Sequence, residues 1–539
     1  MPVTPTFPGV YIEELPSGVR TITGVPTSVT AFVGTAPRGP VDKPIVITSF
    51  ADYERQFGTT SADFPMSYSV FQYYQNGGSM AVIVRLLGTG ATTAAIDLQD
   101  GGGSPGGVTV FSKAPGTYGN KLRVRIDQDN IKDKTDSYNL TVRDPSTGQQ
   151  ERYVSISIGK DAGRSLDKML ESSQIISTKG DGGATTALGV LPEANDPAKV
   201  GEDPLADPKT LPGGSPAVSS PNLNLFYESD NAGSDGTVAD GNYGEEDKKT
   251  GLYALLQTDI FNLLVLPPLA ADAGISGGIL GKALKLCVDK RAMLIVDPPV
   301  SWKSLEIAAN AAGDNKPAPI AGDEASKNAA IYFPRIKAFD RNGSITEFPP
   351  SGTIAGVYAR TDVQRGVWKA PAGTDASLSG VVELTVPLTD LENGRLNPLG
   401  VNCLRRFPVF GSVVWGARTM RGADTAADQW KYVPVRRLAL FIEESLYRGT
   451  KWVVFEPNDE PLWSQIRLNI GAFMNNLFRQ GAFQGKSPKD AYFVKCDKES
   501  TTQNDINLGI VNIIVGFAPL KPAEFVIVKI QQMAGQVEV

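Results

Sequence analysis

The stretch FNLLVLPP, Phe261–Pro268, is a continuous apolar run closed by two prolines. Two further runs of this kind follow, RAMLIVDPP at Arg291–Pro299 and AAIYFPRI at Ala329–Ile336, with helix-permissive segments between them. Strands that are apolar along their whole length are buried on both faces, which is typical of a parallel sheet covered by helices. The three runs therefore predict an α/β sheet in the middle of the chain.

A second α/β unit is predicted upstream of this sheet. The β-rich runs Val29–Val33 and Ile45–Thr48 flank a Pro/Gly turn, and MAVIVRLL, Met80–Leu87, is typical of a buried strand. Ser49 fits the start of a short helix and Gly58 its end, because serine accepts a hydrogen bond from a helix N-terminus and glycine tolerates a helix C-terminus.

The C-terminal part predicts two amphipathic helices followed by strands. The first helix has Pro434 in its first turn and ends near Gly449, and the second is capped by Asn458 and ends near Gly481. The segments KWVVFE, AYFVKC, GIVNIIVGFAP and EFVIVKI are β-rich. An α+β end domain is therefore expected.

Changes in composition divide the chain further. Residues 108–159 alternate polar and apolar side chains in three runs, which predicts a small β-sandwich. Residues 178–249 are rich in Gly, Pro, Asp and Ser, which predicts a long exposed loop. The predicted divisions are 1–26 for an N-terminal arm and linker, 27–100 for an α/β domain, 101–177 for the β-sandwich, 178–250 for the insertion, 251–420 for the α/β core domain and 421–539 for the C-terminal α+β domain with a terminal arm.

The bulk composition excludes several classes of function. The net charge of −6 over 539 residues argues against a general nucleic-acid binder, and no stretch has the apolar length that would cross a bilayer. The cysteines, Cys287, Cys403 and Cys496, lie far apart and are expected to be free, buried thiols. The chain contains no histidine, which removes the usual catalytic base and the commonest metal ligand. No cofactor and no metal are therefore expected.

One segment imitates an enzyme motif. Gly274–Gly278 matches the G-x-S-x-G pattern with Ser276 as the serine, but a serine nucleophile needs a base, and a Ser-Lys arrangement with Lys282 is the remaining alternative. The same segment lacks a glycine and a hydroxyl that a phosphate-binding loop needs. A glycine-rich turn that enters a helix is the better explanation of the pattern, and we expect no enzyme.

The N-terminal stretch FPGVYIEELPSG poses a separate problem. Its short β-prone run, Val10, Tyr11, Ile12, Glu13 and Glu14, has no neighbouring strand in the sequence. A strand needs a ladder partner for its backbone N–H and C=O groups. The run either folds back onto its own domain or pairs with another molecule.

Several segments together resemble the contractile tail sheath proteins of phages and related injection particles. They are TPTFPGVYIEELPSGVRTITGVPTSVTAFVGTAPRGP, APGTYGNKLRV, IAGVYARTDVQRGVWKAPAG, LNPLGVNCLRRFPVFGSVVWGARTM, GAFQGKSPKDAYFVKCD and APLKPAEFVIVKIQQ, in the family's order. The likeness covers nearly the whole chain apart from roughly residues 180–250. It implies stacked six-subunit rings around an inner tube, and an extended state whose contraction drives the tube through a target envelope. The implied partners are other copies of the chain, the inner tail tube protein, and baseplate and tail terminator proteins, in a tail or injection particle assembled in the bacterial cytoplasm.

The resemblance also implies a fold and a set of assembly residues. The α/β core would be subtilisin-like but non-catalytic, with the β-sandwich inserted and the C-terminal domain completed by arms from neighbouring subunits. The implied arm strand is Val10–Glu14, and its hinge linker contains Pro16, Gly18, Gly24 and Pro26. The implied acceptor and C-terminal strands contain Tyr492, Phe493, Val494, Phe525, Val526, Ile527 and Val528.

Contact with the inner tube is assigned to basic residues of the second C-terminal helix and the loop behind it, namely Arg467, Arg479, Lys486 and Lys489. An ordinary solvated helix face is the alternative for these four. For the whole chain, the alternatives are a non-contractile tail or baseplate component with the same end domain, and a hydrolase that uses Ser276. A phage, a headless bacteriocin and an extracellular injection system all fit the resemblance.

Overall fold

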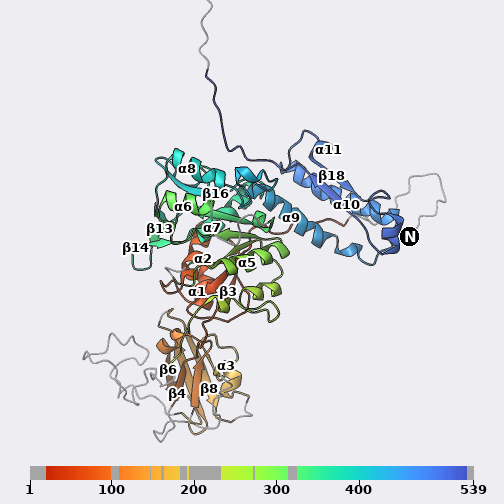
Figure 1. Ribbon diagram of the computed structural model, residues 1–539. Helices are drawn as coiled ribbons and strands as arrows, with labels where there is room; N and C mark the ends of the chain where they lie inside the picture. Colours follow the sequence, from red (N-terminus) through yellow and green to blue (C-terminus); the bar gives the residue numbers. More distant parts are fainter. Residues whose placement is uncertain are drawn as a thin grey trace, which may run out of the picture. The chain divides into compact units, whose positions relative to one another are not determined.

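The chain divides into two compact units, each described here by itself. The large unit comprises residues 28–360 and 371–428, and the small unit comprises residues 1–27, 361–370 and 429–539. The computed structural model (Figure 1) describes residues 20–98, 108–145, 147–159, 163–181, 191–192, 232–270, 274–313 and 324–530.

An eight-stranded sheet forms the centre of the large unit. In spatial order its strands are β17 (Gly411–Val414), β16 (Val401–Phe407), β12 (Ala329–Phe333), β11 (Met293–Val296), β10 (Leu263–Val265), β1 (Thr30–Thr35), β3 (Ala81–Leu86) and β2 (Ile45–Ile47). The six inner strands are parallel, and the two edge strands β17 and β2 are antiparallel to their neighbours. The three apolar runs that predicted parallel strands correspond to β10, β11 and β12.

The sheet joins two ranges that the sequence assigned to separate domains, 27–100 and 251–420. Thr30 of β1 lies opposite Leu263 of β10, so one sheet continues across both ranges. Local composition could not indicate this pairing because some 230 residues separate the two strands along the chain.

Helices cover both faces of the sheet, as its apolar strands require. On one face α5 (Gly277–Asp289) and α6 (Leu305–Gly313) share a core with Val33, Leu264 and Leu294. On the other face Phe32 of β1 contacts the ring of Tyr73 in α2, and Tyr332 of β12 bonds to Tyr358 in α7. The remaining bounds are α1 (Phe50–Phe57), α2 (Pro65–Gln75), α7 (Ser351–Arg365) and α8 (Asp390–Leu396).

The predicted cap of α1 is confirmed. Ser49 Oγ accepts a hydrogen bond from the Asp52 N–H at 3.1 Å, and Gly58 ends the helix with a positive φ of 91°. None of the helices in the described part of the chain is both long and apolar enough to cross a membrane.

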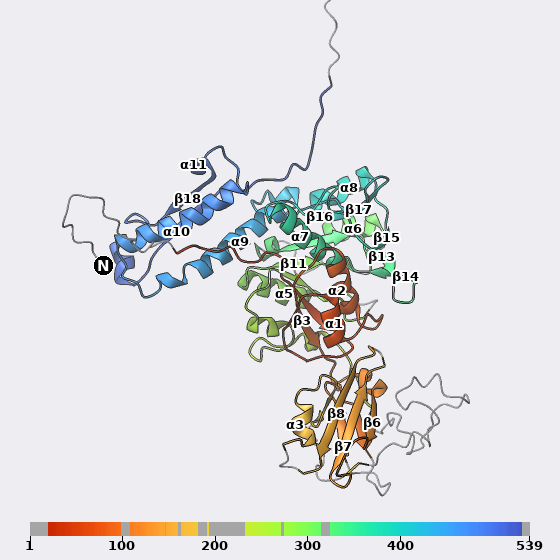
Figure 2. The ribbon, with the colours of Figure 1, turned by 180° about the vertical axis from the view of Figure 1, so that it is seen from behind.

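Two small antiparallel sheets lie between β3 and β10 in sequence (Figure 2). One contains β4 (Ala95–Leu98), β5 (Val108–Ser112) and β9 (Ile176–Ser177), and the other contains β6 (Arg123–Asp127), β7 (Ser137–Arg143) and β8 (Gln150–Ser157). Side chains from both sheets and from α3 (Leu166–Leu170) form one hydrophobic cluster. We call these elements the inserted module.

The inserted module is connected to the eight-stranded sheet unit by a short neck, residues 88–92 and 234–237. Thr89 and Thr237 exchange backbone hydrogen bonds of 2.9 and 3.1 Å, and Thr92 and Ser234 exchange two of 3.0 Å. Beyond the neck, Tyr243 is 1% exposed in the core of the large unit. Residues 232–250 are therefore ordered, although the sequence predicted a loop over 178–250. Their pairing is non-local, so composition did not indicate it.

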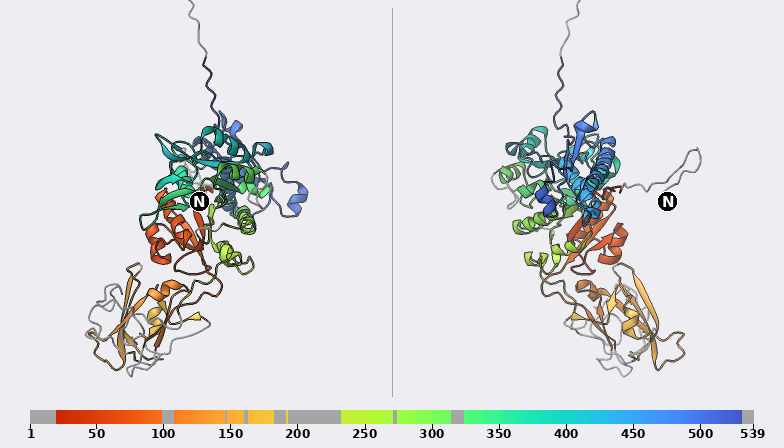
Figure 3. Two further views of the ribbon diagram at one scale, coloured as in Figure 1. Left: turned by 60° about the vertical axis from the view of Figure 1, so that its left-hand side comes forward. Right: turned by 90° about the vertical axis from the view of Figure 1, so that its right-hand side faces the viewer.

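Shorter elements complete the large unit (Figure 3). A three-stranded sheet contains β14 (Ile345–Phe348), β13 (Ile336–Phe339) and β15 (Val381–Leu384). The described residues of this unit include the 3-10 helices η1 (Thr117–Lys121), η4 (Asp240–Tyr243), η5 (Gly251–Gln257), η6 (Glu324–Asn328), η7 (Asn397–Leu399) and η8 (Asp424–Ala426).

The small unit is built on two long helices, α9 (Val433–Gly449) and α10 (Glu460–Arg479), both of which the sequence predicted. Shorter elements follow, namely η9 (Lys451–Val453) between the helices, then α11 (Pro488–Ala491), β18 (Tyr492–Lys495), α12 (Gln503–Asn507) and β19 (Ile514–Phe517). The hydrophobic core includes Leu438, Ile442, Ile466, Phe473 and Leu477.

Two local predictions for the small unit are wrong. The N-cap of α10 is Asp459, whose side chain accepts from the Leu462 N–H at 3.2 Å, whereas Asn458 bonds to Trp463 and Ile510. The segment KWVVFE forms η9 and a turn, not a strand, and Phe455 adopts a positive φ of 71°. The segment lies between the end of α9 and the start of α10, and in the described chain no strand lies next to it that could pair with it.

Candidate assembly site in the small unit

A two-stranded sheet, β18 with β19, packs on α10 and is the first part of the candidate site. Phe493 lies opposite Gly516, and a Cβ atom on Gly516 would stand 2.2 Å from the Phe493 ring. Because Gly516 has no side chain, the Phe493 ring can lie over β19 at this position. The sequence carried this signal, because an isolated glycine within a β-rich run indicates a close approach.

The sheet leaves one edge of β18 without a ladder partner in the described chain, and it leaves apolar side chains exposed. Among the described residues, β18 has β19 as its one ladder partner, and beyond β19 a backbone bond of 2.8 Å joins Ala518 to Ala491. Phe493 and Ile514 are 56% and 47% exposed. A two-stranded sheet is marginal in isolation, and an open edge presents a template for a further strand.

The last described segment, residues 525–530, is the second part of the candidate site. The sequence predicted a strand that contains Phe525, Val526, Ile527 and Val528, but the structure has no ladder there within the described chain, and the segment is an extended trace (Figure 2). These four side chains are 73–82% exposed, and Ile530 is 93% exposed. The prediction of a strand is therefore wrong for the single chain, because an extended run becomes a strand only when a neighbour supplies hydrogen bonds.

The start of this segment is held in place. The Tyr432 hydroxyl donates a hydrogen bond of 3.1 Å to the Glu524 carboxylate, one residue before the exposed run. Tyr432 precedes α9, so this contact joins the exposed segment to the beginning of that helix. Sequence reasoning missed this contact because nothing local couples positions 432 and 524.

The N-terminal part of the prediction is only partly within the described structure. Val10, Tyr11, Ile12, Glu13, Glu14, Pro16 and Gly18 lie outside the described residues. Gly24, which was assigned to a hinge, lies against Phe441, and a Cβ at Gly24 would stand 2.9 Å from that ring. Pro26 is exposed two residues later.

The four basic residues assigned to the inner tube differ in their surroundings. Arg467 on α10 pairs with Glu460 at 2.6 Å and also donates to the Cys496 carbonyl, so its charge is neutralised within the unit. Arg479 at the end of α10, Lys486 in the loop that follows and Lys489 in α11 are exposed.

The motif around Ser276 has a structural role. The Ser276 side chain caps α5 and accepts from the Ile279 N–H at 3.4 Å. Lys282 lies exposed on the same helix, and no hydrogen bond joins it to Ser276 in the described structure. A capping serine without a base at hand does not form a nucleophile.

Asp297 is the carboxyl group with the most perturbed acidity. Burial raises its pKa to about 6, although hydrogen bonds from Ser351 and the charge of Arg335 favour the ionised form. The Ser351 N–H and hydroxyl donate to it at 2.8 and 2.7 Å, so Asp297 caps the start of α7.

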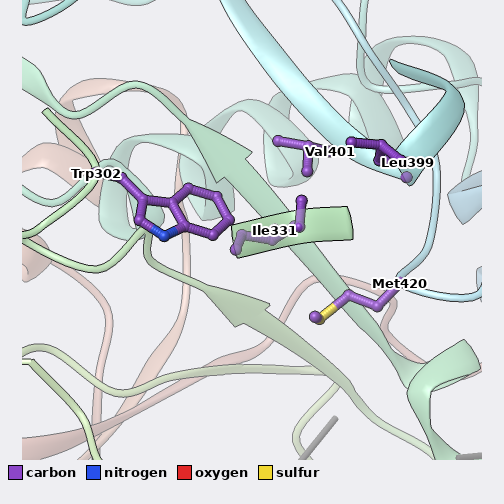
Figure 4. A pocket seen from close by; sticks show the side chains of 7 residues that line it. Trp302, Ile331, Leu399, Val401 and Met420 are labelled. Atoms are coloured by element: carbon purple, nitrogen blue, oxygen red, sulfur yellow. The ribbon is translucent and has the colours of Figure 1, made fainter. Parts of the chain in front are cut away.

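No ligand or metal site emerges elsewhere in the described residues. Burial raises the pKa of Cys403 to about 12 and of Cys496 to about 11, and also raises that of Cys287, so the thiols stay protonated. Metal-binding clusters of Cys, Asp or Glu are absent from the residues that the structure describes. A cavity of about 10 Å³ beside Trp302 and Ile331 is lined by apolar side chains and is too small for a substrate (Figure 4).

Two protein-family models match this chain. The phage tail sheath protein central domain matches residues 294–420, and the phage tail sheath C-terminal domain matches residues 425–533. The first contains β12, β16 and β17 of the eight-stranded sheet, and the second contains the candidate assembly site.

Individual proteins are similar over most of the chain. The tail sheath protein of Burkholderia phage BcepMu is 23% identical, over 88% of this chain and 87% of the relative. The anti-feeding prophage baseplate in its contracted state contains a chain with a TM-score of 0.57 and 18% identity, covering 98% of this chain and 99% of that one. The helical sheath of the same particle, also contracted, gives a TM-score of 0.54 and 23% identity, over 98% and 100% of the two chains. The solved structures establish a shared mixed α/β, multi-sheet fold, and residues 294–420 and 425–533 of this chain match the central and C-terminal domains of phage tail sheath proteins.

Proposed function

We propose that this chain is the structural subunit of a contractile tail sheath. It polymerises as stacked six-subunit rings around an inner tube and contracts from a metastable extended state, which drives the tube through a target cell envelope. Its partners are other copies of itself, the tube protein, and baseplate and terminator proteins. The large unit supplies a subtilisin-like, non-catalytic core with the inserted module as a β-sandwich, and we expect no enzymatic activity.

One observation carries this proposal, the exposed apolar segment 525–530 in the same unit as an open two-stranded sheet. Val526 and Ile527 are both 82% exposed, and burial of such a side chain contributes about 1.5–3 kcal/mol. Each backbone hydrogen bond that a paired strand gains adds about 0.5–1.5 kcal/mol. A single chain forgoes both contributions, and a neighbouring copy can supply both by strand addition.

The same chemistry extends to the N-terminal arm. Residues 10–14 would add a second strand to a neighbouring copy's β18–β19 sheet, as the family resemblance implies. With one strand donated from each chain end, every subunit is joined to several others. Arg479, Lys486 and Lys489 contact the inner tube, whereas the charge of Arg467 is neutralised by Glu460 and contributes less to this contact.

Substitution of two residues in the exposed segment 525–530 tests the proposal. Val526→Pro with Val528→Pro removes two backbone donors on the same edge of the segment, so electron microscopy should show that long tubes are lost. Circular dichroism and the thermal unfolding of the unassembled chain should stay as in the native protein, because both side chains are exposed. The matched control, Val526→Thr with Val528→Thr, keeps the β-branched shape and the donors and should still form tubes.

Other outcomes count against the proposal in distinct ways. Tubes of normal length from the proline variant would contradict the assembly role of the segment. Native tubes that keep one length and diameter under all conditions would contradict contraction and favour a non-contractile tail component. Single rings without tubes would favour a baseplate component.

A further inference from the structure

The residues between the N-terminal arm and the large unit form a strap, which we define as residues 20–27. Its outer end is fixed by Arg20, whose backbone N–H donates to Asn469 Oδ1 at 3.1 Å and whose guanidinium lies 4.7 Å from the centre of the Trp452 ring. Ile22 is 6% exposed and belongs to the hydrophobic core of the small unit. The strap thus contributes to that core.

The middle of the strap follows α9 closely. The Val25 N–H donates to Ser445 Oγ at 3.2 Å, and Ser445 is completely buried. Gly24 passes the Phe441 ring at a distance that leaves no room for a side chain. Backbone that is packed and hydrogen-bonded in this way has little freedom to act as a hinge.

The inner end of the strap is held by a buried ion pair. Arg437 and Asp362 are each 3% exposed and lie 2.6 Å apart. Thr27 completes this network, because its hydroxyl donates to Asp362 at 2.7 Å and its carbonyl accepts from Arg437 at 3.0 Å. A buried pair of this kind keeps its geometry, since separating its members leaves charges without solvent or partner.

We propose that the strap stays attached to α9 and α10 during assembly and contraction, and that the arm pivots only before Arg20. This inference rests on the proposed function for its contraction step. It replaces the expectation that the hinge linker extends to Gly24 and Pro26. Six residue steps separate Glu14 from Arg20, so, whatever their conformation, they span at most about 20 Å. The acceptor sheet must therefore remain within about that distance of Arg20 in both states of the sheath.

Hydrogen exchange of the unassembled chain tests the strap without reference to sheath function. A peptide that covers residues 20–27 should exchange slowly, and Ser445→Ala, which removes the acceptor of the Val25 N–H, should speed this exchange about tenfold or more. Ser464→Ala, on the exposed face of α10, is the matched control and should leave the exchange unchanged. Rapid exchange of the native peptide would overturn the proposal even if tubes form and contract normally.

A disulfide tests the strap during contraction. The Cβ of Ile22 lies 3.1 Å from the position that a Cβ on Gly449 would take, so Ile22→Cys with Gly449→Cys places the sulfurs within bonding reach after a small shift. The oxidised variant should assemble and contract like the same variant kept reduced. Tubes that assemble but contract only after reduction would show that the strap must detach, and this would overturn the proposal.

A second cysteine pair covers the case in which the first variant fails to assemble even when reduced. Val25→Cys with Ser445→Cys joins the strap to α9 one turn away, at positions already in hydrogen-bond contact. The same comparison of oxidised and reduced tubes then decides between a fixed strap and a hinge. If the native chain itself forms no tubes, the sheath function fails, whereas the exchange experiment still decides whether the strap is fixed.

Discussion

The central sheet of the large unit and the sheet of the small unit differ in how far their apolar strands find hydrogen-bond partners within the chain. Six parallel strands of the large unit lie between neighbours of the same chain, and short antiparallel strands close both edges. In the small unit two strands are paired and a third apolar run remains extended and exposed. One unit thus pairs its apolar strands within the chain, while in the other, among the described residues, an apolar run has no ladder partner and is exposed. Substitutions in the buried core of either unit should therefore affect folding, whereas substitutions at this exposed run and its sheet should affect assembly.

The largest effect is expected at the ion pair of the small unit. Arg437→Met leaves Asp362 buried without its charged partner, which should lower the stability of the small unit by about 3–5 kcal/mol. Amides of α9 should then exchange about a hundredfold faster, while amides of the eight-stranded sheet keep their native rates. Arg437→Met combined with Asp362→Leu removes both charges and should recover part of the loss. Equal acceleration of amide exchange in both units would contradict this prediction.

A core truncation in the large unit should show the reverse pattern. Leu264 is completely buried in β10, and Leu264→Ala should cost about 2–5 kcal/mol, because the cavity it leaves closes only in part. Amides of β1 and β11 should exchange faster, with α10 unaffected. Leu391→Ala is the control, because Leu391 is 87% exposed, and it should change stability by less than about 0.5 kcal/mol.

Asp297 gives the large unit a predicted pH dependence. Its pKa is raised to about 6 in the folded chain, so folding favours the protonated carboxyl group, and this stabilisation is present below pH 4 and disappears as the pH rises through 6. The Asp297→Asn variant should lack this decline, so its stability relative to the native chain should rise between pH 4 and 6 by about 1–3 kcal/mol. Denaturant titrations across this range measure the difference, with Asp289→Asn on the exposed side of α5 as control. A constant difference would contradict the prediction.

The smallest effect on stability is expected at Gly516 in the two-stranded sheet of the small unit. Gly516→Ala places a methyl group 2.2 Å from the Phe493 ring, and because this ring is half-exposed it can swing away at a cost of about 1 kcal/mol. Assembly should weaken more than folding, since the displaced ring belongs to the sheet that we propose as the acceptor of a strand. Phe493→Ala in the Gly516→Ala background should relieve the clash in the unassembled chain. Thermal unfolding and the yield of tubes separate the two effects.

The sequence predicted what local patterns encode. The apolar runs at β10, β11 and β12 marked strands buried on both faces, and the apolar stripes of α9 and α10 marked two helices that pack on one side. Ser49 and Gly58 marked the ends of α1 because each residue type suits one helix terminus.

Non-local contacts account for most of what the sequence did not reveal. The pairing of β1 with β10 joined two ranges that had been assigned to separate domains, and the neck pairing ordered residues that had been assigned to a loop. Two β-rich runs, KWVVFE and EFVIVKI, are not strands in the single chain, because β-propensity describes fit to a neighbour that the chain does not provide. Of the assembly residues, Gly516 carried a readable signal, whereas Tyr432 and Glu524 are close only in space.

The neck at Thr89 and Thr237 has a consequence for how such chains diversify. Its two strands enter and leave side by side, so a tight turn of a few residues can close the gap that removal of the inserted module would leave. The inserted module can therefore be exchanged, enlarged or removed without a change in the register of the main sheet, so this part of the chain's surface can vary independently of the eight-stranded core.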